Sequence, residues 1–468
     1  MLEGSIRDHA RWTPRAPAVI TPTHVMSYAQ FDADIDRLGA AFRDLGIGPD
    51  SGVVALQIDL PYLHYAAICA LARIGAISAP GHDGAADLRI TDSDEARPHQ
   101  PTLRIGGEAL GAILAAEPRP LPVLKPDPES LARVMLTSGT TLRPRRIGLS
   151  WRRLEAVNHT TLRTYGAGRL GTWIPLPGID SMMGYGFAMA AWSTGGALTS
   201  IPDVAQLPKW LESLAPGMLG ATPTQLSSLL EALPAGFTPR PAWRIFSGGS
   251  MLPTALARET CLRITPDLII NYGSTEASIN ALCRVDHQAP PGTVGYTPHG
   301  ATVEVLAPEG ESGEIRIRSS RMTLGYLDDP AATAERFRDG WFHPGDVGRR
   351  LPDGRLVLEG RVDDRMILAD VGKFMPALLE DAALTCPGVL DAAAFAVPNA
   401  AGLDDCWLAI VSDVGFDRES LATHLAAYRG LPANRFAWID EIPRNAMGKI
   451  DRNKLREALL AALDQGHA

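Results

Sequence analysis

Lysine is scarce in this chain of 468 residues. Only five of the 44 basic residues are lysines, at positions 125, 209, 373, 449 and 454, and the other 39 are arginines. Acidic residues number 53, so the formal net charge is −9. Nonspecific binding of nucleic acid depends on clustered cations. A chain with a net negative charge and no basic block is therefore not predicted to bind nucleic acid.

Cysteines and long apolar runs are also few. The five cysteines, at positions 69, 261, 283, 386 and 406, form no CxxC pair, which predicts reduced, buried thiols in a cytoplasmic protein. The eleven histidines form no HExxH motif, so a zinc site is not predicted. No apolar run approaches the roughly 20 residues that span a bilayer. The first residues, MLEGSIRDHARW, lack the apolar core of a signal peptide.

The composition that remains is globular, with 46% hydrophobic and 21% charged residues. The length favours two or three domains. Residues 27–47 place apolar side chains at helical spacing and reach a stop signal near Gly46. Residues 62–80 indicate a buried helix that leads into a strand. Strand candidates then alternate with helical segments, which predicts a layered α/β fold.

Several strand candidates end in turns that are rich in glycine, serine and threonine. They occur in the stretches RVMLTS, GMLGATP, WRIFSGG and LIINYGSTE. Ligands of open α/β sheets bind beyond the carboxyl ends of the strands. We therefore expect the binding site at the turns after RVML, WRIF and LIIN.

The pattern changes near residue 293, where strand–turn–strand segments begin. Glu309-Gly310 and Asp353-Gly354 are predicted hairpin turns. After Asp363 the chain returns to a mixed α/β pattern. We predict a large N-terminal domain at 1–363 with a small β-rich subdomain at about 293–363. A small mobile α+β C-terminal domain at 364–468 would follow a short hinge.

The segment LTSGTTLRPRR, at 136–146, combines four hydroxyl side chains with three arginines around a glycine. Hydroxyls and backbone NH groups in a tight loop bind phosphate oxygens, and nearby cations offset the phosphate charge. Taken alone, the segment is equally compatible with an ordinary polar loop.

The segment NYGSTEAS, at 271–278, is the second candidate for ligand binding. Glu276 offers a hard oxygen ligand that suits magnesium. Thr275 can add a phosphate contact, and Tyr272 can cover an aromatic base. The same pattern is also typical of a helix start capped by Ser274 or Thr275.

Five stretches in this order resemble the adenylate-forming superfamily of acyl-CoA synthetases, adenylation domains of nonribosomal peptide synthetases and luciferases. They are the opening from APAVI to GVVALQ, TSGTTLRPRR, NYGSTE, the stretch from GYLDDP to VDDRMI, and PRNAMGKIDRNKLRE. The resemblance covers nearly the whole chain. It implies a ligase that uses ATP and Mg²⁺ to adenylate a small carboxylic acid, releasing pyrophosphate. The acyl group then passes to the thiol of coenzyme A, or of phosphopantetheine on a separate carrier protein.

The resemblance also implies site residues. Lys449 matches the catalytic lysine, whose cation stabilises charge that develops at the α-phosphate. Glu276 is implied as the magnesium ligand and, with Thr275, as part of the catalytic set, while Asp363 matches the hinge. Asp180 and Ala221 are implied at the acid. The implied nucleotide-binding residues are Thr137, Ser138, Gly139, Thr140, Thr141, Arg145, Ser247, Gly248, Gly249, Asn271, Tyr272, Gly273, Asp346 and Arg361.

Three features depart from the family's pattern. In the phosphate loop, Leu142 replaces the usual glycine and Arg145 the usual lysine. The irregular segment 364–380 falls where relatives form the tunnel for the thiol, so an amine or another nucleophile is an alternative acceptor. Asp180 stands where many acyl-CoA synthetases carry histidine. It is either the partner of a substrate amine or a solvated or capping carboxylate.

Leu142 also motivates a third alternative, a catalytically inactive relative that binds a nucleotide or an acyl ligand. The sequence leaves the identity of the acid, the acyl acceptor and the oligomeric state open.

Overall fold

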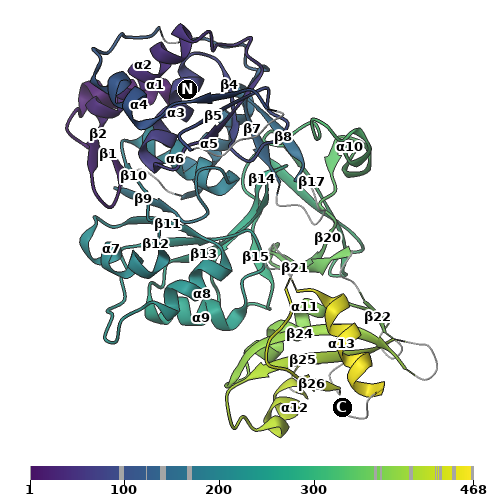
Figure 1. Ribbon diagram of the computed structural model, residues 1–468. Coiled ribbons are helices and arrows are strands. Elements are labelled where there is room, and N and C mark those ends of the chain that lie inside the picture. The colour runs from purple at the N-terminus through teal and green to yellow at the C-terminus, as the bar shows by residue number, and fades with distance from the viewer. Residues whose placement is uncertain are drawn as a thin grey trace.

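The fold is a large N-terminal α/β body followed by a smaller C-terminal unit (Figure 1). The computed structural model describes residues 2–93, 100–122, 124–137, 144–165, 171–362, 366–368, 372–399, 404–426, 428, 431, 435–444 and 450–464. Within these ranges the strands form five sheets. The predicted fold class, a layered α/β domain with a β-rich part and a small α+β part, is confirmed.

An eight-stranded sheet forms the middle of the large body. Its edge strands β14 and β2 run antiparallel to their neighbours, and the six strands between them pair in parallel. In spatial order the strands are β14 (Ser278–Arg284), β13 (Leu268–Ser274), β12 (Arg244–Ser247), β11 (Gly217–Ala221), β9 (Thr172–Pro175), β10 (Ala197–Thr199), β1 (Pro17–Ile20) and β2 (Val25–Ser27).

A six-stranded sheet lies beside it and is parallel except for the edge strand β8. Its strands are, in spatial order, β6 (Thr102–Arg104), β5 (Leu88–Thr91), β3 (Val53–Gln57), β4 (Ile77–Pro80), β7 (Leu131–Leu136) and β8 (Arg146–Ser150). The strand predictions for RVML, GMLGA, WRIFS and LIIN are confirmed by β7, β11, β12 and β13.

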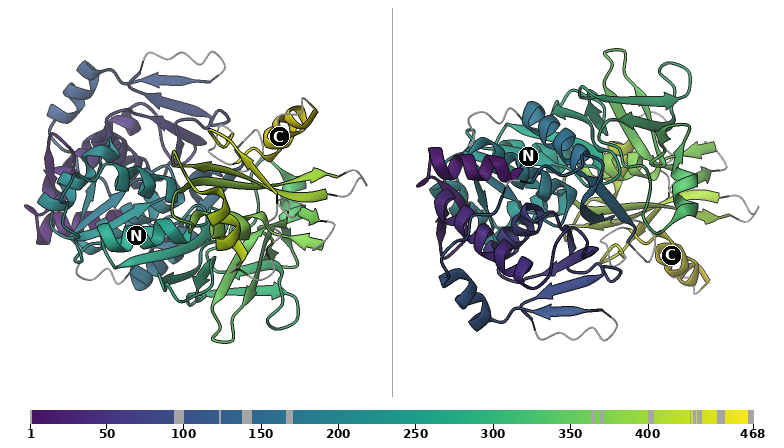
Figure 2. Two further views of the ribbon diagram at one scale, coloured as in Figure 1. Left: turned by 90° about the horizontal axis from the view of Figure 1, so that it is seen from below. Right: turned by 90° about the horizontal axis from the view of Figure 1, so that it is seen from above.

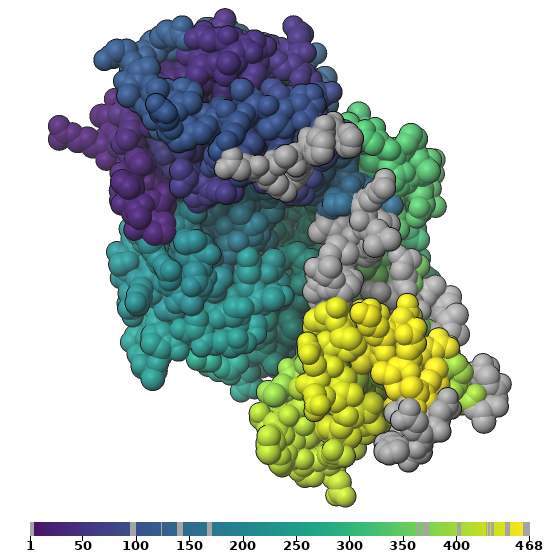
Figure 3. Space-filling view, in the orientation of Figure 1, coloured from purple at the N-terminus to yellow at the C-terminus, as the bar shows by residue number. Residues whose placement is uncertain are grey.

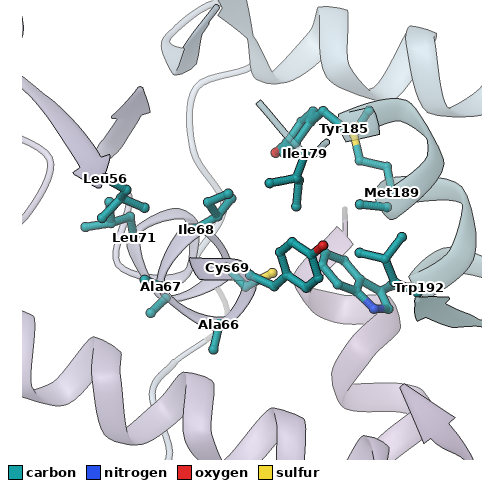
Figure 4. Close-up of a cluster of buried hydrophobic side chains, with 14 of the residues drawn as sticks. Leu56, Ala66, Ala67, Ile68, Cys69, Leu71, Ile179, Tyr185, Met189 and Trp192 are labelled. Atoms are coloured by element: carbon teal, nitrogen blue, oxygen red, sulfur yellow. The ribbon is translucent and has the colours of Figure 1, made fainter. Parts of the chain in front are cut away.

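Helices fill the space between the two sheets and cover their outer faces. One hydrophobic core joins both sheets to α1 (Leu2–Trp12), α2 (Tyr28–Asp44), α3 (Pro61–Arg73), α5 (Trp151–Tyr165) and α6 (Met182–Thr194). Figure 4 shows side chains of α3 and α6 meeting in this core. The helix predicted within 27–47 and the buried helix predicted within 62–80 are confirmed by α2 and α3.

Further helices pack on the other face of the eight-stranded sheet or at the rim. The short 3-10 helix η1 (Val204–Gln206) and the helices α7 (Leu207–Ser213), α8 (Pro223–Glu231) and α9 (Thr254–Arg263) share a second core with β9, β11, β12 and β13. At the rim, α4 (Gly107–Ala115) packs against α2.

The β-rich part is a seven-stranded sheet that begins at residue 293. Both predicted hairpin turns are confirmed, because Gly310 (φ 81°) joins β16 to β17 and Gly354 (φ 88°) joins β20 to β21. The elements are β15 (Thr293–Gly295), β16 (Ala301–Leu306), β17 (Gly313–Ser319), α10 (Pro330–Arg336), β18 (Phe337–Arg338), β19 (Trp341–Phe342), β20 (Asp346–Arg350) and β21 (Leu356–Arg361).

The C-terminal unit forms a lobe of its own in the space-filling view (Figure 3). Its three-stranded sheet carries a hydrophobic cluster on each face. Its elements are β22 (Met366–Leu368), β23 (Gly372–Phe374), α11 (Pro376–Leu384), β24 (Val389–Pro398), β25 (Asp404–Ser412), α12 (Arg418–Ala426), β26 (Phe436–Trp438) and α13 (Arg452–Asp464). In Figure 2 this lobe and the β-rich sheet lie on the same side, away from the N-terminal helices.

Helix α11 connects this lobe to the large body through two consecutive carboxylates. Asp381 accepts hydrogen bonds from the backbone N (2.7 Å) and the hydroxyl (2.8 Å) of Thr254, the first residue of α9. Glu380 accepts from Arg452 Nη2 (2.5 Å) and from the backbone N of Ala394 (2.9 Å) inside the lobe. Asp381 thus caps a helix of the large body.

Across the described ranges, no helix combines the length and the apolar character needed to cross a membrane.

Candidate active site

The carboxyl ends of three neighbouring parallel strands bring several predicted site residues together. In the register of β11, β12 and β13, Ala221 pairs with Ser247, and Ser247 pairs with Ile270. Ala221, the segment 247–249 and the segment 271–273 therefore meet at one edge of the eight-stranded sheet. Strand β7 of the other sheet ends at Leu136, just before Thr137.

Gly248 lies in a space too small for a side chain. A Cβ atom there would lie 2.9 Å from the carbonyl oxygen of Asn271 and 2.9 Å from Met183 Cε. Next to it, Gly249 has a φ of 95°, which favours glycine. Ser247 Oγ and Asn271 Oδ1 are buried and have no hydrogen-bond partner among the residues that the structure describes. Buried polar atoms are normally paired, so these two oxygens fit a polar ligand such as a nucleotide.

Tyr272, Asp346 and Arg361 form one hydrogen-bonded cluster, although they come from separate segments. The Tyr272 hydroxyl donates to Asp346 Oδ2 (2.6 Å), and Arg361 Nη1 donates to Asp346 Oδ1 (3.0 Å). Burial and the neighbouring Asp346 raise the pKa of Tyr272 well above its usual value. Each oxygen of a carboxylate has two lone pairs, which suits Asp346 to accept hydrogen bonds from hydroxyl groups such as those of a ribose.

The segment that contains Glu276 is a tight connection between antiparallel strands. β13 ends at Ser274, β14 begins at Ser278, and these two residues pair with each other. Ser274 Oγ accepts from the backbone N of Ala277 (3.1 Å). The interpretation of this segment as a helix start is wrong. The strand pairing leaves only three residues between the strands, and Ser278 takes a φ of 60°, so no helical turn forms there.

The Glu276 carboxylate lies among residues from the phosphate loop and the β-rich part. Its Oε1 accepts from the Tyr326 hydroxyl (2.9 Å). The Arg145 guanidinium lies over the Tyr326 ring, 5.1 Å from its centroid, and Arg145 Nε donates to Asp329 Oδ2 (3.1 Å). Burial, followed by the charge and hydrogen bond of Glu276, raises the pKa of Tyr326.

Glu276 suits a metal ion that arrives with its own ligands. The described part of the chain contains no group of three or more His, Cys, Asp or Glu residues that could hold a metal ion. Magnesium commonly binds through one or two carboxylates together with substrate phosphates and water. A single carboxylate near a phosphate loop therefore fits magnesium bound to a nucleotide.

Asp180 already has a cationic partner within the chain. Arg133 Nη2 donates to Asp180 Oδ1 (2.6 Å), and His64 Nε2 lies 3.4 Å from the same oxygen. Burial alone would raise the pKa of Asp180, but the neighbouring His64 and Arg133 lower it to about 2. The residue that caps α6 is Ser181, whose hydroxyl accepts from the backbone N of Gly184 (2.9 Å).

Several predicted site residues lie outside the described residues: Ser138, Gly139, Thr140, Thr141, Asp363 and Lys449, together with Leu142. The described residues next to them are well paired. Thr137 N donates to the carbonyl of Arg145 (2.9 Å) at the base of the phosphate loop. Arg444 and Ile450 form an antiparallel bridge on either side of 445–449.

Two residues near the carboxylate were missed in the sequence. Tyr326 holds the Glu276 side chain, and Arg153 on α5 donates from Nη2 to the carbonyl oxygens of Thr275 (2.7 Å) and Glu276 (2.9 Å). The pattern that could have indicated Arg153 in the sequence is its position on the face of α5 that also carries Leu154 and Val157, which is the buried face. A cation on the apolar face of an amphipathic helix indicates a buried polar partner.

A family model and two known proteins match this chain. The family model described as AMP-binding enzyme matches residues 6–93 and 82–327. A 3-hydroxybenzoate–CoA ligase from Aromatoleum sp. (strain CIB) is 27% identical over 95% of this chain and 94% of its own length. A 4-chlorobenzoate–CoA ligase from Arthrobacter sp. is 30% identical over 78% of this chain and 71% of its own length.

A solved structure shares the fold as well. The ATP-bound MatB from Rhodopseudomonas palustris superposes with a TM-score of 0.81 at 22% identity, covering 98% of this chain and 99% of that one. The chain belongs to the AMP-binding enzyme family. The two relatives named above are acid–thiol ligases that use coenzyme A.

Proposed function

We propose that this chain is an ATP-dependent acid–thiol ligase that adenylates a small carboxylic acid and transfers the acyl group to coenzyme A. The observation that carries the proposal is the hydrogen-bonded cluster of Tyr272, Asp346 and Arg361. Tyr272 lies on β13, and Glu276 follows the end of that strand. This arrangement supports a nucleotide site next to a magnesium ligand. The pantetheine thiol of a separate carrier protein is the second acceptor to test.

The first half-reaction joins the acid to AMP. A carboxylate oxygen attacks the α-phosphorus of ATP, the bond between the α-phosphorus and the bridging oxygen breaks, and pyrophosphate leaves with that oxygen. Ser247, Gly248, Gly249, Asn271 and Gly273 would hold the adenine side, and Asp346 and Arg361 the ribose side. Magnesium, when bound, neutralises phosphate charge, with Glu276 as its protein ligand and Thr275 beside it. Thr137, residues 138–141 and Arg145 would contact the phosphates.

The second half-reaction replaces AMP by a thiol. The thiol sulfur attacks the acyl carbon, its proton passes to solvent or a base, and the acyl–phosphate bond breaks so that AMP leaves. We propose that residues 1–363 and 364–468 rotate about Asp363 between the two half-reactions. Asp180 and Ala221 are proposed to lie at the acid.

Exchange of labelled pyrophosphate into ATP, over a panel of carboxylic acids, tests the adenylation step. At least one small acid should support exchange that depends on magnesium. The best acid is then offered with coenzyme A, carrier protein and amines, and thioester formation should exceed amide formation. If no acid supports exchange, the ligase proposal is wrong; if only amines are acylated, the acceptor is wrong.

Lys449 is proposed as the cation that stabilises the charge developing on the α-phosphate during adenylation. Lys449→Ala should abolish exchange but largely spare thioester formation from a preformed acyl-AMP, because only the first half-reaction uses the cation. Lys454→Ala is the matched control: its ammonium is exposed and lies 3.8 Å from Asp451 Oδ2, so it should behave as wild type. Normal exchange by Lys449→Ala would remove the catalytic assignment.

A further inference from the structure

We propose that Arg153 is a positioning residue for the adenylation step, because it fixes the backbone on both sides of Glu276 and so aims that carboxylate at magnesium. This inference rests on the proposed role of Glu276 as the magnesium ligand. Arg153 itself lies on α5, more than a hundred residues earlier in the chain.

The contacts of Arg153 determine the orientation of two peptide groups. Its Nη2 donates to the carbonyl oxygen of Thr275 (2.7 Å) and to that of Glu276 (2.9 Å). These carbonyls belong to the peptide groups immediately before and after the Cα atom of Glu276. Holding both peptide planes fixes φ and ψ at that residue, and with them the direction in which its side chain leaves the backbone.

Neighbouring contacts support the same turn. The backbone N of Thr323 donates to the carbonyl of Glu276 (2.8 Å), and Tyr326 binds the carboxylate. Arg153 Nε donates to the carbonyl of Arg321, which anchors the guanidinium from the other side. Glu276 is therefore held at its backbone by Arg153 and at its carboxylate by Tyr326.

The charge of Arg153 suits this role. The residue is only 4% exposed, and its hydrogen bonds go to the carbonyl oxygens of Gly148, Thr275, Glu276 and Arg321. The N–H groups of Arg153 donate to carbonyl oxygens and so stabilise the turn. The Glu276 carboxylate therefore keeps acceptor sites for a metal ion.

The turn needs support because its backbone is unusual. Ser278 has a φ of 60°, a region that costs free energy for residues other than glycine. Site groups must be held to within about 0.5 Å of their productive position. A turn of three residues that ends in such a conformation depends on its surroundings for that precision.

The test compares two variants. Arg153→Met keeps the apolar stem, whereas Arg153→Lys keeps a charge but lacks the planar guanidinium that binds the Arg321 carbonyl through Nε and the Thr275 and Glu276 carbonyls through Nη2. Arg153→Met should raise the apparent magnesium constant in pyrophosphate exchange about tenfold, as expected when charged hydrogen bonds are lost. The KM for the acid should stay within about twofold of wild type. For Arg153→Lys, the apparent magnesium constant should lie between the values of wild type and Arg153→Met.

Arg152→Met is the matched control, because the neighbouring Arg152 is exposed and its pair with Glu129 lies at the surface. It should match wild type in every constant. Thermal unfolding of each variant, measured in parallel, shows how far a change in stability accompanies the change in kinetics.

A binding measurement separates this inference from the proposed function. Calorimetry with ATP, in magnesium and in EDTA, gives the gain in nucleotide affinity that magnesium provides. Arg153→Met should lose most of this gain and keep the affinity measured in EDTA. If wild type binds no ATP, the proposed function fails. If wild type shows a gain that Arg153→Met retains, or if the variant loses only stability, the positioning role is wrong.

Discussion

Two buried arginines serve two of the carboxylates of the candidate site, Asp180 and Glu276, in opposite ways. Arg133 binds the carboxylate of Asp180 directly, with its Nη2 2.6 Å from Oδ1. Arg153 lies close to Glu276 but binds the carbonyl oxygens on both sides of it. The two arginines have similar burial, at 1% and 4% exposure. Their difference therefore lies in which oxygen atoms they bind.

This difference determines whether each carboxylate can bind a further cation. The negative charge of Asp180 is compensated inside the protein, so a further cation gains little there. Among the described residues, the Glu276 carboxylate accepts a hydrogen bond only from the Tyr326 hydroxyl, so it retains acceptor sites for a metal ion. An arginine beside a carboxylate thus either neutralises it or positions it.

The largest effect should come from removing the charge of the positioned carboxylate. Glu276→Gln keeps the shape and the acceptor oxygen for Tyr326 but removes the anion that is proposed to bind magnesium. We expect pyrophosphate exchange to fall at least about 100-fold. Asp180→Asn is the contrasting variant, since its carboxylate is proposed to bind no metal, and it should retain far more exchange. Equal losses of pyrophosphate exchange in the two variants would show that the two carboxylates do not have different roles.

The second effect concerns stability at the paired carboxylate. Asp180→Ala leaves Arg133 as a buried cation without its ion partner, which should lower the free energy of unfolding by about 3 kcal/mol. Arg133→Met should cost less, because the Asp180 side chain is 31% exposed and can be hydrated. Urea unfolding of both variants and of the double variant measures this asymmetry, and the double variant should be more stable than Asp180→Ala.

Substrate selectivity of Asp180→Ala tests the interpretation of this residue as the partner of a substrate amine. A selective rise in KM for amino-bearing acids would support it, since those acids alone would lose an ion pair. Because Arg133 already neutralises Asp180, we expect similar changes for amino-bearing acids and their non-amino counterparts. The measurement is pyrophosphate exchange with matched pairs of acids.

The pH dependence of the Asp180–Arg133 pair follows from the lowered pKa of Asp180. Its value of about 2 in the folded chain lies below the roughly 3.9 of an unfolded aspartate. The stabilisation is therefore fully present above about pH 4 and is lost as the pH falls through about 2. The difference in unfolding free energy between wild type and the Asp180→Ala/Arg133→Met double variant should shrink over that interval. A constant difference would contradict the pairing.

The smallest effect should come from Tyr326→Phe, which removes one hydrogen bond to the Glu276 carboxylate. The magnesium constant should rise about fivefold, corresponding to roughly 1 kcal/mol. Arg153→Met should exceed it, because the backbone of the turn is then unsupported. A larger effect of Tyr326→Phe would mean that the hydroxyl, and not Arg153, positions the carboxylate.

Sequence reasoning correctly predicted the strands whose formation depends on residues close together in the chain. The strands ending at Leu136, Ser247 and Ser274 were predicted because each is an apolar run followed by a turn. The same reasoning failed at Ser274–Glu276, because a helix cap and a tight strand connection use the same small polar residues. Only the pairing of β13 with β14 distinguishes them.

The contacts of Arg133 and Arg153 could not be predicted from the sequence, because their partners lie far away along the chain. Arg133 lies 47 residues from Asp180, and Arg153 lies 123 residues from Glu276. Nothing in the local pattern around Asp180 indicates which cation will reach it. The resemblance to a family suggested the carboxylates, whereas their partners depend on how two separate sheets pack together.

Helix α11 gives the proposed domain rotation a cost in free energy. Asp381 supplies the side-chain cap of α9, whose own preceding residue, Pro253, offers none. Rotating the small lobe away would leave this helix end uncapped, and a cap is worth about 1 kcal/mol. That energy corresponds to about a fivefold change in the ratio of the two orientations. A single aspartate would thus set part of the population balance between the two half-reactions, without touching either substrate.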